Sequence, residues 1–498
     1  MFFFTRFFFI FFVFIFLSAC HEKDYDIIEE ARNLILNDKD KEKKKKEGNA
    51  SSKIINKKRI EEKTRETFDN NKSKVENKNL KKSKKIIKEK QVKKEQKTSR
   101  VLENLKKNDI KKKKVERLET PKDFSKKYEN NFSNTIKVGV MLPLTGERQQ
   151  VGNLILNAIE MAIFQTEDSK LELVIKDTEA KPEKAKNVFF ELIDEGVSIV
   201  IGPLFSKSLA AIQSSVQSNG VNIFALTNNI NLGKKGIWVF GVDPQAQTKK
   251  VLEFALEKGS KKIAALLPKN AYGLLLFDTI SKFSQENLIE IKKVEFYEFS
   301  IENQRKAAQK ISKGFDQYQE ILNQLKEQED DATINKDEVL IDKPFDSVFI
   351  AAAGQNLTVL SSQLQYNNVD PKLVQYLGIS SWEDNSILRE PALEGGIFVT
   401  TSQLYQDKIK LIYKNSFNKE MPKIAMIAYD IVALLGSLEY IESFIDVNNL
   451  INDEGYIGLR GLFRLKNNGI VERTFQLKQV KNKKFSTLKK AITDFSGF

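Results

Sequence analysis

The sequence has almost no cysteine and almost no histidine. In 498 residues there is one of each, Cys20 and His21, and the two are adjacent near the N-terminus. The chain beyond residue 21 therefore cannot form an internal disulfide, a zinc site of cysteine and histidine ligands, a cysteine–histidine nucleophile or a Ser-His-Asp triad. Chemistry that uses only carboxylates stays open.

Enzyme motifs are missing as well. No GxGxxG sequence follows a predicted strand, and no Walker GxxxxGK[ST] sequence is present. Gly455, Gly458 and Gly461 are three residues apart, but they precede a predicted strand, where a turn is the simpler interpretation. Glu383 and Asp384 are adjacent, and neighbours in sequence seldom converge on one substrate. We therefore expect a protein that is not an enzyme and that uses no metal or cofactor.

The positive charge is concentrated in one segment. The net charge of the chain is +14. Residues 21–133 carry 37 basic and 22 acidic side chains, whereas residues 134–498 carry 43 basic and 45 acidic ones. The segment from residue 134 onward is thus close to neutral, and the basic character belongs to the residues before it.

The N-terminus resembles a bacterial lipoprotein signal. An apolar run from Phe7 to Leu17 is followed by Ser18, Ala19 and Cys20. Eleven apolar residues are too few for a spanning helix, which needs about 20, but they suit a signal peptide over residues 1–19. The ending resembles the lipobox, which implies cleavage before Cys20 and a diacylglyceryl anchor on its sulfur. His21 at the next position favours the outer membrane by the same resemblance, and an uncleaved anchor or an incidental cysteine is the alternative.

Residues 20–133 are predicted to form a lipidated, lysine-rich tether. More than half of the side chains from 21 to 133 are charged, so too little apolar surface is available to offset the entropy of folding. We expect a disordered segment or a fluctuating single helix that serves as a spacer. Binding of polyanions through clustered lysines is the alternative. Nucleic acid is not expected, because aromatic residues for base stacking are not interleaved.

From residue 136 the pattern alternates between strands and helices. In the first array, predicted for a lobe at 134–244, helices separate four strands: the IKVGVML run, 171–177, 197–202 and 221–226. The second array, predicted for a lobe at 245–400, has strands at 262–267, 291–299, 347–352 and 373–379. Residues 401–498, with a buried helix at 424–435 and strands GLFRL and ERTFQL, are expected to complete both lobes. The fold class is therefore α/β, with two parallel-sheet lobes.

Hydroxyl and amide side chains follow several predicted strands. Open parallel sheets bind ligands at the carboxyl ends of their strands. Ser206, Thr227 and Asn229 follow strands of the first array, and Tyr272 and Ser381 follow strands of the second. These five residues are candidate ligand-binding residues. The alternative is that Ser206 is a helix cap and that Thr227 and Asn229 are turn residues.

Five short motifs resemble type I periplasmic-binding proteins of the Leu/Ile/Val-binding class: IKVGVMLPLTG, VIGPLFS, IFALTNN, NAYG and YDIVALLGSL. The resemblance implies two Rossmann-like lobes joined by a hinge that the chain crosses three times. It also implies that Ser206, Thr227 and Asn229 hold a ligand's carboxylate and ammonium and that Tyr272 is the aromatic wall. The sequence departs from the pattern after the LGI strand, where Ser380, Ser381 and Trp382 stand in place of an acidic partner for the ammonium.

A further resemblance is to the penicillin-binding protein activator lipoproteins. The lipobox, the charged tether, GPLFS and LGISSWED fit that group, although its N-terminal helical-repeat domain is replaced here by the tether. The resemblance implies a non-enzymatic periplasmic lipoprotein whose partner is a penicillin-binding protein or another cell-wall synthase. The alternative function is the substrate receptor of an ABC importer for branched-chain amino acids or related small solutes.

The second lobe carries an insertion at about 300–345. Apolar residues there alternate steps of three and four, as in a coiled coil: Ala308, Ile311, Phe315, Tyr318, Leu322 and Leu325. This spacing predicts a helix whose Phe315 and Tyr318 dock a partner protein, or alternatively a helix that packs against its own lobe.

Overall fold

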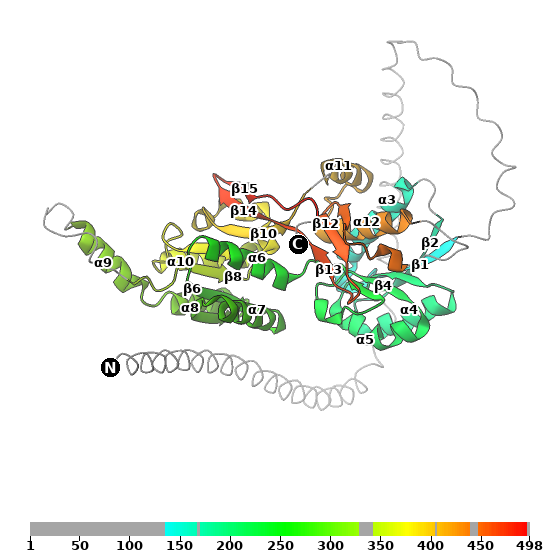
Figure 1. The fold of residues 1–498 in the computed structure, drawn as a ribbon, viewed down its shortest axis with the longest axis horizontal. Coiled ribbons are helices and arrows are strands. Elements are labelled where there is room, and N and C mark those ends of the chain that lie inside the picture. The colour runs from blue at the N-terminus through cyan, green and yellow to red at the C-terminus, as the bar shows by residue number, and fades with distance from the viewer. Residues whose placement is uncertain (1–134, 167–169, 328–341, 404–405, 439–446, 496–498) are drawn as a thin grey trace, which may run out of the picture. The chain divides into compact units, whose positions relative to one another are not determined.

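A computed structural model of the chain describes residues 135–166, 170–327, 342–403, 406–438 and 447–495 (Figure 1). The expected signal peptide, the tether and Cys20 lie outside these residues. Among the helices of the described part, none combines the length and the apolar character that crossing a membrane would require.

Lobe 1 is built around a sheet of five parallel strands in the order β2-β1-β3-β4-β5. The strands are β1 (Ile136–Leu142), β2 (Leu171–Asp177), β3 (Ile199–Ile201), β4 (Asn222–Ala225) and β5 (Ile237–Val239). Helices α3 (Gln149–Gln165) and α12 (Lys423–Gly436) pack together on one face, and α4 (Pro182–Asp194) and α5 (Ser206–Val216) pack together on the other. The strand β5 is missing from the sequence-based prediction, which has four strands in this lobe.

The strands of lobe 1 are apolar on both sides because helices cover both faces. Val138 and Val140 of β1 belong to the core beneath α3 and α12, whereas Met141 belongs to the core beneath α4 and α5. Such nearly continuous apolar runs are typical of buried parallel strands. Pairing of Ile136 with Leu171 and of Leu142 with Asp177 keeps β1 and β2 in register along their whole length.

Lobe 2 contains a seven-stranded sheet in the order β15-β14-β10-β9-β8-β6-β7. Its parallel part consists of β6 (Lys262–Pro268), β7 (Glu290–Tyr297), β8 (Ser347–Ile350), β9 (Gln375–Gly378) and β10 (Ile397–Thr401). Two antiparallel strands, β14 (Phe475–Lys481) and β15 (Lys484–Lys489), extend it beyond β10. Its helices form two pairs, α6 (Pro244–Glu257) with α7 (Ala271–Asn287) and α8 (Ile301–Ile311) with α10 (Gly354–Tyr366).

A small antiparallel sheet completes lobe 1. It consists of β11 (Tyr456–Gly458), β12 (Gly461–Leu465) and β13 (Val471–Arg473). Leu459, Phe463 and Val471 of this segment lie in the lobe 1 core. The sequence predicted one strand, ERTFQL, where the structure has two: β13 ends at Arg473 on lobe 1, and β14 begins at Phe475 in lobe 2.

The chain passes between the lobes three times. The first passage joins β5 to α6, the second joins β10 to α11 (Gln406–Phe417), and the third joins β13 to β14. Lobe 1 therefore contains residues from both ends of the folded segment.

The inserted helix of lobe 2 differs from the coiled-coil prediction. It is two helices, α8 and α9 (Phe315–Glu327), separated at Ser312–Gly314. Gly314 has a φ of +93°, which a residue with a side chain rarely adopts, so the helix cannot continue there. Phe315 is fully buried, with its ring centroid 4.8 Å from that of Phe345. Phe315 is therefore a core residue of lobe 2 and not part of an exposed docking face, while Tyr318 is half-buried beside it.

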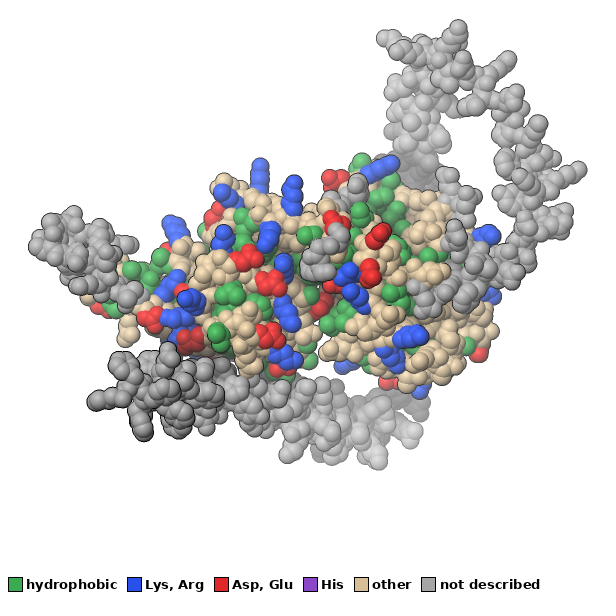
Figure 2. All heavy atoms as spheres, in the orientation of Figure 1, with side chains coloured by type: hydrophobic (Ala, Val, Ile, Leu, Met, Phe, Trp, Pro, Cys, Tyr) green, Lys and Arg blue, Asp and Glu red, His purple; other side chains and the backbone are tan. Residues whose placement is uncertain are grey.

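The surface of the described residues mixes charges of both signs. On the face shown in Figure 2, Lys and Arg side chains are interspersed with Asp and Glu over both lobes. This distribution agrees with the nearly equal counts of basic and acidic residues after residue 133.

Candidate functional site

A cavity of about 1030 Å³ lies between the two lobes. Lobe 1 contributes Asn228 from the segment after β4, Val242 from the first passage, and Lys423 at the start of α12. Lobe 2 contributes Tyr272 from the first turn of α7 and the turn that follows β9. The carboxyl ends of strands from both sheets thus converge on this cavity, which we call the interlobe cleft.

Glu383 is the acidic centre of the cleft. Its side chain is 6% exposed. Lys478 Nζ lies 2.8 Å from Oε1, while Lys423 Nζ and Arg460 Nη1 lie 3.1 and 3.6 Å from Oε2. Thr400 Oγ1 donates a hydrogen bond of 2.9 Å to Oε2. The side-chain amide of Gln403 also donates to Oε1, so three cations, a hydroxyl and an amide surround one carboxylate.

The Glu383 network connects the two lobes. Glu383 and Lys478 belong to lobe 2, whereas Lys423 starts a lobe 1 helix and Arg460 lies between β11 and β12. The ammonium of Lys423 also donates to the carbonyl oxygens of Ser380 and Glu383, at 3.1 and 2.9 Å. The Lys423 side chain of lobe 1 therefore contacts both the carboxylate of Glu383 and two main-chain acceptors of the turn after β9.

The electrostatics of this cluster keep the carboxylate ionised. Burial alone would raise the pKa of Glu383, but the charges of Lys423, Arg460 and Lys478 lower it to about 2. Burial lowers the pKa of Arg460 and of Lys423, and Glu383 opposes the shift in each case. Glu383 is thus a negative charge at every physiological pH, already surrounded by the protein's own cations.

A second buried carboxylate lies nearby. Asp430 of α12 accepts hydrogen bonds from the backbone N–H groups of Leu459 and Arg460, at 2.8 and 3.4 Å. Burial raises its pKa to about 6, against the effect of those hydrogen bonds and of Arg473. Gly458 is required at its position because an added Cβ would lie 2.4 Å from Asp430 Oδ2. Asp430 therefore holds the loop that presents Arg460 to the cleft.

Two predicted site residues line the cleft. Tyr272 lies in the first turn of α7, which Asn270 caps, and burial raises the pKa of the tyrosine hydroxyl to about 12. Ser381 follows β9, and its hydroxyl donates to the Ala352 carbonyl at 3.0 Å. Whether either side chain holds a ligand stays a prediction.

The other three predicted residues are not among those that line the cleft. Ser206 is the first residue of α5, and Phe205 occupies the cap position before it. Thr227 is buried, and its hydroxyl accepts a hydrogen bond of 3.3 Å from the Asn229 N–H. Asn229 Oδ1 in turn accepts one of 3.3 Å from the Asn231 N–H. Thr227 and Asn229 thus have the local turn contacts that the sequence offered as the alternative.

Sequence reasoning missed the charged residues of the cleft. The acidic residue sought after the LGI strand does exist, one position beyond Trp382. Lys423, Arg460 and Lys478 carry no motif and come from three separate segments, so no local pattern could have assigned them to Glu383. In the described ranges, no group of three or more His, Cys, Asp and Glu side chains could hold a metal ion.

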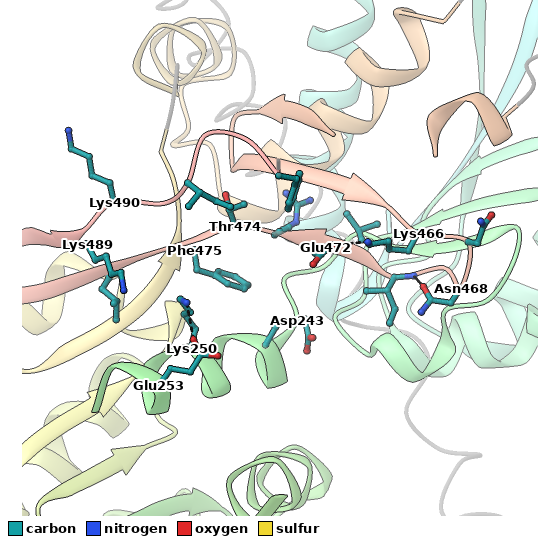
Figure 3. A pocket seen from close by; sticks show the side chains of 18 residues that line it. Asp243, Lys250, Glu253, Lys466, Asn468, Glu472, Thr474, Phe475, Lys489 and Lys490 are labelled. Carbon is teal, nitrogen blue, oxygen red and sulfur yellow. Dashed lines mark hydrogen bonds and ion pairs between the residues drawn. The ribbon is translucent and has the colours of Figure 1, made fainter. Parts of the chain in front are cut away.

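A second cavity, of about 800 Å³, lies among α6, the segment leading into β13, and the end of β15 (Figure 3). Its charged side chains are largely paired. Lys250 contacts Glu253 at 2.8 Å, and Lys466 contacts Glu472 at 3.1 Å. Five basic and three acidic side chains line this cavity, so the two ion pairs leave an excess of positive charge.

Residues 135–438 match the family model described as periplasmic binding protein. An uncharacterised protein of Rickettsia prowazekii is 24% identical over 361 residues, which cover 71% of this chain and 88% of that protein. A penicillin-binding protein activator, LpoA, of Glaesserella parasuis is 22% identical over 137 residues. That match covers 27% of this chain and 23% of the activator.

Two solved structures illustrate the similarity of fold. An ABC transporter substrate-binding protein from Sphaerobacter thermophilus has a TM-score of 0.53 and 17% identity, covering 73% of this chain and 99% of that one. The C-domain of LpoA from Haemophilus influenzae, a regulator of PBP1A, has a TM-score of 0.50 and 16% identity, covering 71% of this chain and 99% of that one. At these identities the likeness concerns the fold alone.

Proposed function

Because the chain belongs to the periplasmic binding protein family, we propose that it uses this fold as a non-enzymatic periplasmic lipoprotein that regulates a peptidoglycan synthase. Regulation would act through protein contact, with a penicillin-binding protein as the partner. The proposal includes a diacylglyceryl anchor on Cys20, in the outer membrane, and a tether over residues 20–133. Membrane, tether and folded module would then be arranged in the order of the sequence.

Similarity of sequence supports this choice over a transport receptor. The LpoA activator of Glaesserella parasuis matches over 137 residues of this chain, and the LpoA C-domain has a similar fold. The fold by itself is equally compatible with a substrate-binding protein of an ABC transporter. The two functions must therefore be separated by the chemistry of the interlobe cleft.

The observation that carries the proposal is the state of Glu383. An amino acid bound in the cleft would need an acidic partner for its ammonium, and Glu383 is the buried acid there. Lys423, Arg460 and Lys478 already contact its carboxylate, and Lys423 also occupies two carbonyl acceptors beside it. Burying an ammonium without a partner costs a few kcal/mol of affinity. The cleft is therefore poorly suited to free amino acids.

The alternative is the receptor of an ABC importer for branched-chain amino acids or related small solutes. The size of the cleft favours it, as does the presence of Tyr272 and Ser381 in the wall. In that case Ser206, Thr227 and Asn229 would have to turn toward the ligand when the lobes close. A receptor would gain stability from its ligand, and a regulator would not.

The test is a thermal-shift screen of the protein with amino acids and their amides, together with affinity capture of a peptidoglycan synthase from the same cell envelope. We expect no saturable shift and co-purification of the synthase. A receptor at about 100 times Kd would gain about 2.7 kcal/mol, which is easily detected. A saturable shift with leucine or isoleucine would overturn the proposal in favour of the receptor. An unrelated envelope lipoprotein serves as the capture control.

A further inference from the structure

The second cavity, which we call the hinge cavity, is formed by both lobes at the third passage of the chain (Figure 3). Lobe 1 contributes residues between 466 and 473, and lobe 2 contributes one face of α6 and the end of β15. Leu477 of β14 lines this cavity, whereas Lys478, the next residue of the strand, lines the interlobe cleft. Because successive side chains of a strand point to opposite faces, the two cavities lie on opposite sides of β14. An occupant of the hinge cavity would therefore contact both lobes without entering the cleft.

A β-bulge turns Lys489 of lobe 2 toward the hinge cavity. Leu477 pairs with Lys489, although the register of the rest of β15 would place Leu488 there. Lys489 therefore lies on the face of the sheet that lines the cavity, and bulges often redirect a side chain in this way beside a functional site. Lys489 Nζ lies 3.4 Å from Glu257 Oε1, and both side chains are more than half exposed. Such an exposed ion pair holds the lysine only weakly, so another anion can replace Glu257.

Lys466 supplies a matching positive charge from lobe 1. Its Nζ lies 3.1 Å from Glu472 Oε2, and the same oxygen lies 2.6 Å from Arg464 Nε. Because Arg464 would remain as the partner of Glu472, Lys466 can turn to another anion without leaving that carboxylate unpaired. Lys466 and Lys489 lie on opposite sides of the cavity in Figure 3. Each lobe thus offers one lysine to a negative group.

Apolar side chains line the hinge cavity between these two lysines. They include Ala246 of α6, Ile470, Phe475 and Ile492. Phe475 is half-buried, and Ile492 is 42% exposed. Covering such side chains with apolar groups of a partner removes their surface from water and is favourable. The cavity, with a volume of about 800 Å³, therefore combines apolar walls with a cation on either side.

We propose that the hinge cavity docks an extended, acidic segment of the partner protein, with a carboxylate at each end and apolar side chains between them. Lys466 and Lys489 bind the two carboxylates, and Phe475 and Ile492 contact the apolar side chains. This inference rests on the proposed function, which takes the partner to be a protein, and it adds the place where that partner binds. Because the segment contacts both lobes at the third passage, docking would restrict the angle between them.

Isothermal titration of the full-length chain with the acetylated and amidated peptide Glu-Leu-Phe-Glu, at physiological ionic strength, tests the site. The control peptides are Gln-Leu-Phe-Gln, which lacks the charges, and Glu-Ser-Ser-Glu, which lacks the apolar side chains. We expect one-to-one, saturable binding of Glu-Leu-Phe-Glu alone. Lys466→Met and Lys489→Met should each weaken it about fivefold, because a hydrogen bond to a carboxylate is lost. Lys484→Met is the matched control, since Lys484 is exposed on β15 and is not among the residues that line the cavity; it should leave the Kd unchanged.

All three variants keep the lysine-rich segment before residue 134, so attraction of the peptide to that segment would be the same in each. No binding of Glu-Leu-Phe-Glu, equal weakening by the three substitutions, or equally tight binding of Glu-Ser-Ser-Glu would overturn the proposal. The titration contains no synthase, so these results are independent of the capture experiment. Failure to capture a synthase, with binding of the peptide intact, would count against the proposed function and leave the hinge cavity as a peptide site.

Discussion

Glu383 stays ionised in the folded protein because three cations stabilise its carboxylate more than burial destabilises it. The cations in turn depend on Glu383 as their counter-charge, because Lys423, Arg460 and Lys478 are buried or half-buried around it. Removing the carboxylate would leave these cations without a counter-charge, and breaking a buried ion pair from one side is strongly destabilising. The role of Glu383 is therefore clearest in the stability of the fold.

We predict that Glu383→Gln lowers the free energy of unfolding by about 3 kcal/mol at neutral pH. The folded pKa of about 2 lies below the ordinary value of 4.5, so this contribution is complete above pH 4.5 and is lost as pH falls toward 2. Urea unfolding of the wild type and the variant between pH 2.5 and 7 measures the difference.

Glu420→Gln is the control for this experiment, because Glu420 is an exposed acid paired with Lys414. It should change the unfolding free energy by less than about 1 kcal/mol. A difference between wild type and Glu383→Gln that did not shrink at low pH would contradict the assignment of the charge to Glu383.

Neighbouring residues in the sequence can have unrelated roles, and the sequence alone could not tell them apart here. Glu383 is buried in the interlobe cleft, whereas Asp384 is exposed and caps a short helix by accepting from the Ser386 N–H at 2.9 Å. The partners of Glu383 could not be predicted, because Lys423, Arg460 and Lys478 approach it only through the folding of distant segments.

At the level of elements, both lobes have the same close contact between the first turn of a helix and the end of the strand before it. Gly152 of α3 and Gly273 of α7 each lie in the first turn of the helix that follows the first strand of their lobe. An added Cβ would lie 1.9 Å from the Pro143 carbonyl oxygen in one case and 1.9 Å from that of Pro268 in the other. Each glycine thus lets a helix approach the end of its strand.

The helix α9 provides the prediction at this scale. Phe315→Ala should lower the free energy of unfolding by about 3–5 kcal/mol, because it removes a fully buried ring that packs on Phe345. Ile321→Ala, on the same helix but 40% exposed, should cost less than about 1 kcal/mol. Urea unfolding measures both changes. If Phe315→Ala caused only a small loss of stability but abolished synthase binding, the result would instead support Phe315 as part of a docking surface.

Elements with a clear period or an apolar run could be predicted from the sequence. The expected strands at 171–177 and 262–267 and the expected helix at 424–435 lie at nearly the observed positions of β2, β6 and α12. The three-residue strand β5 was not predicted, although β3, which has the same length, was. The boundary between β13 and β14 was missed because both are strands, and Thr474 between them lies where the chain passes from one lobe to the other.

For the whole molecule, the proposed arrangement places the folded module at the end of a long tether on a lipid anchor. We predict that Cys20→Ser abolishes incorporation of labelled palmitate and releases the protein from the membrane fraction. Lys408→Met, which leaves the lipobox intact, should behave as the wild type in both assays. Continued membrane association of Cys20→Ser without label would contradict lipid anchoring and favour an uncleaved apolar segment.

The fold class could be predicted because it depends on the order of strands and helices, which a single sequence displays. The site could be predicted only in part, since Tyr272 and Ser381 line the cleft but its charged residues were not foreseen. Strand ends are local features of a sequence. The charges of the cleft come from distant segments that the three passages of the chain bring together. No local pattern in the sequence could therefore predict how they balance.

The third of these passages has a consequence for the order of folding. The core of lobe 1 combines Ile136–Phe240 with residues between Tyr413 and Val471, and α3 packs directly on α12. As the chain is made from its N-terminus, one face of the first sheet is covered only by α3, without α12, until the parallel strands of lobe 2 have already emerged. The residues that complete the lobe 1 core are therefore made only after the parallel strands of lobe 2, and until then the apolar face that α12 covers is a site where a growing chain could aggregate.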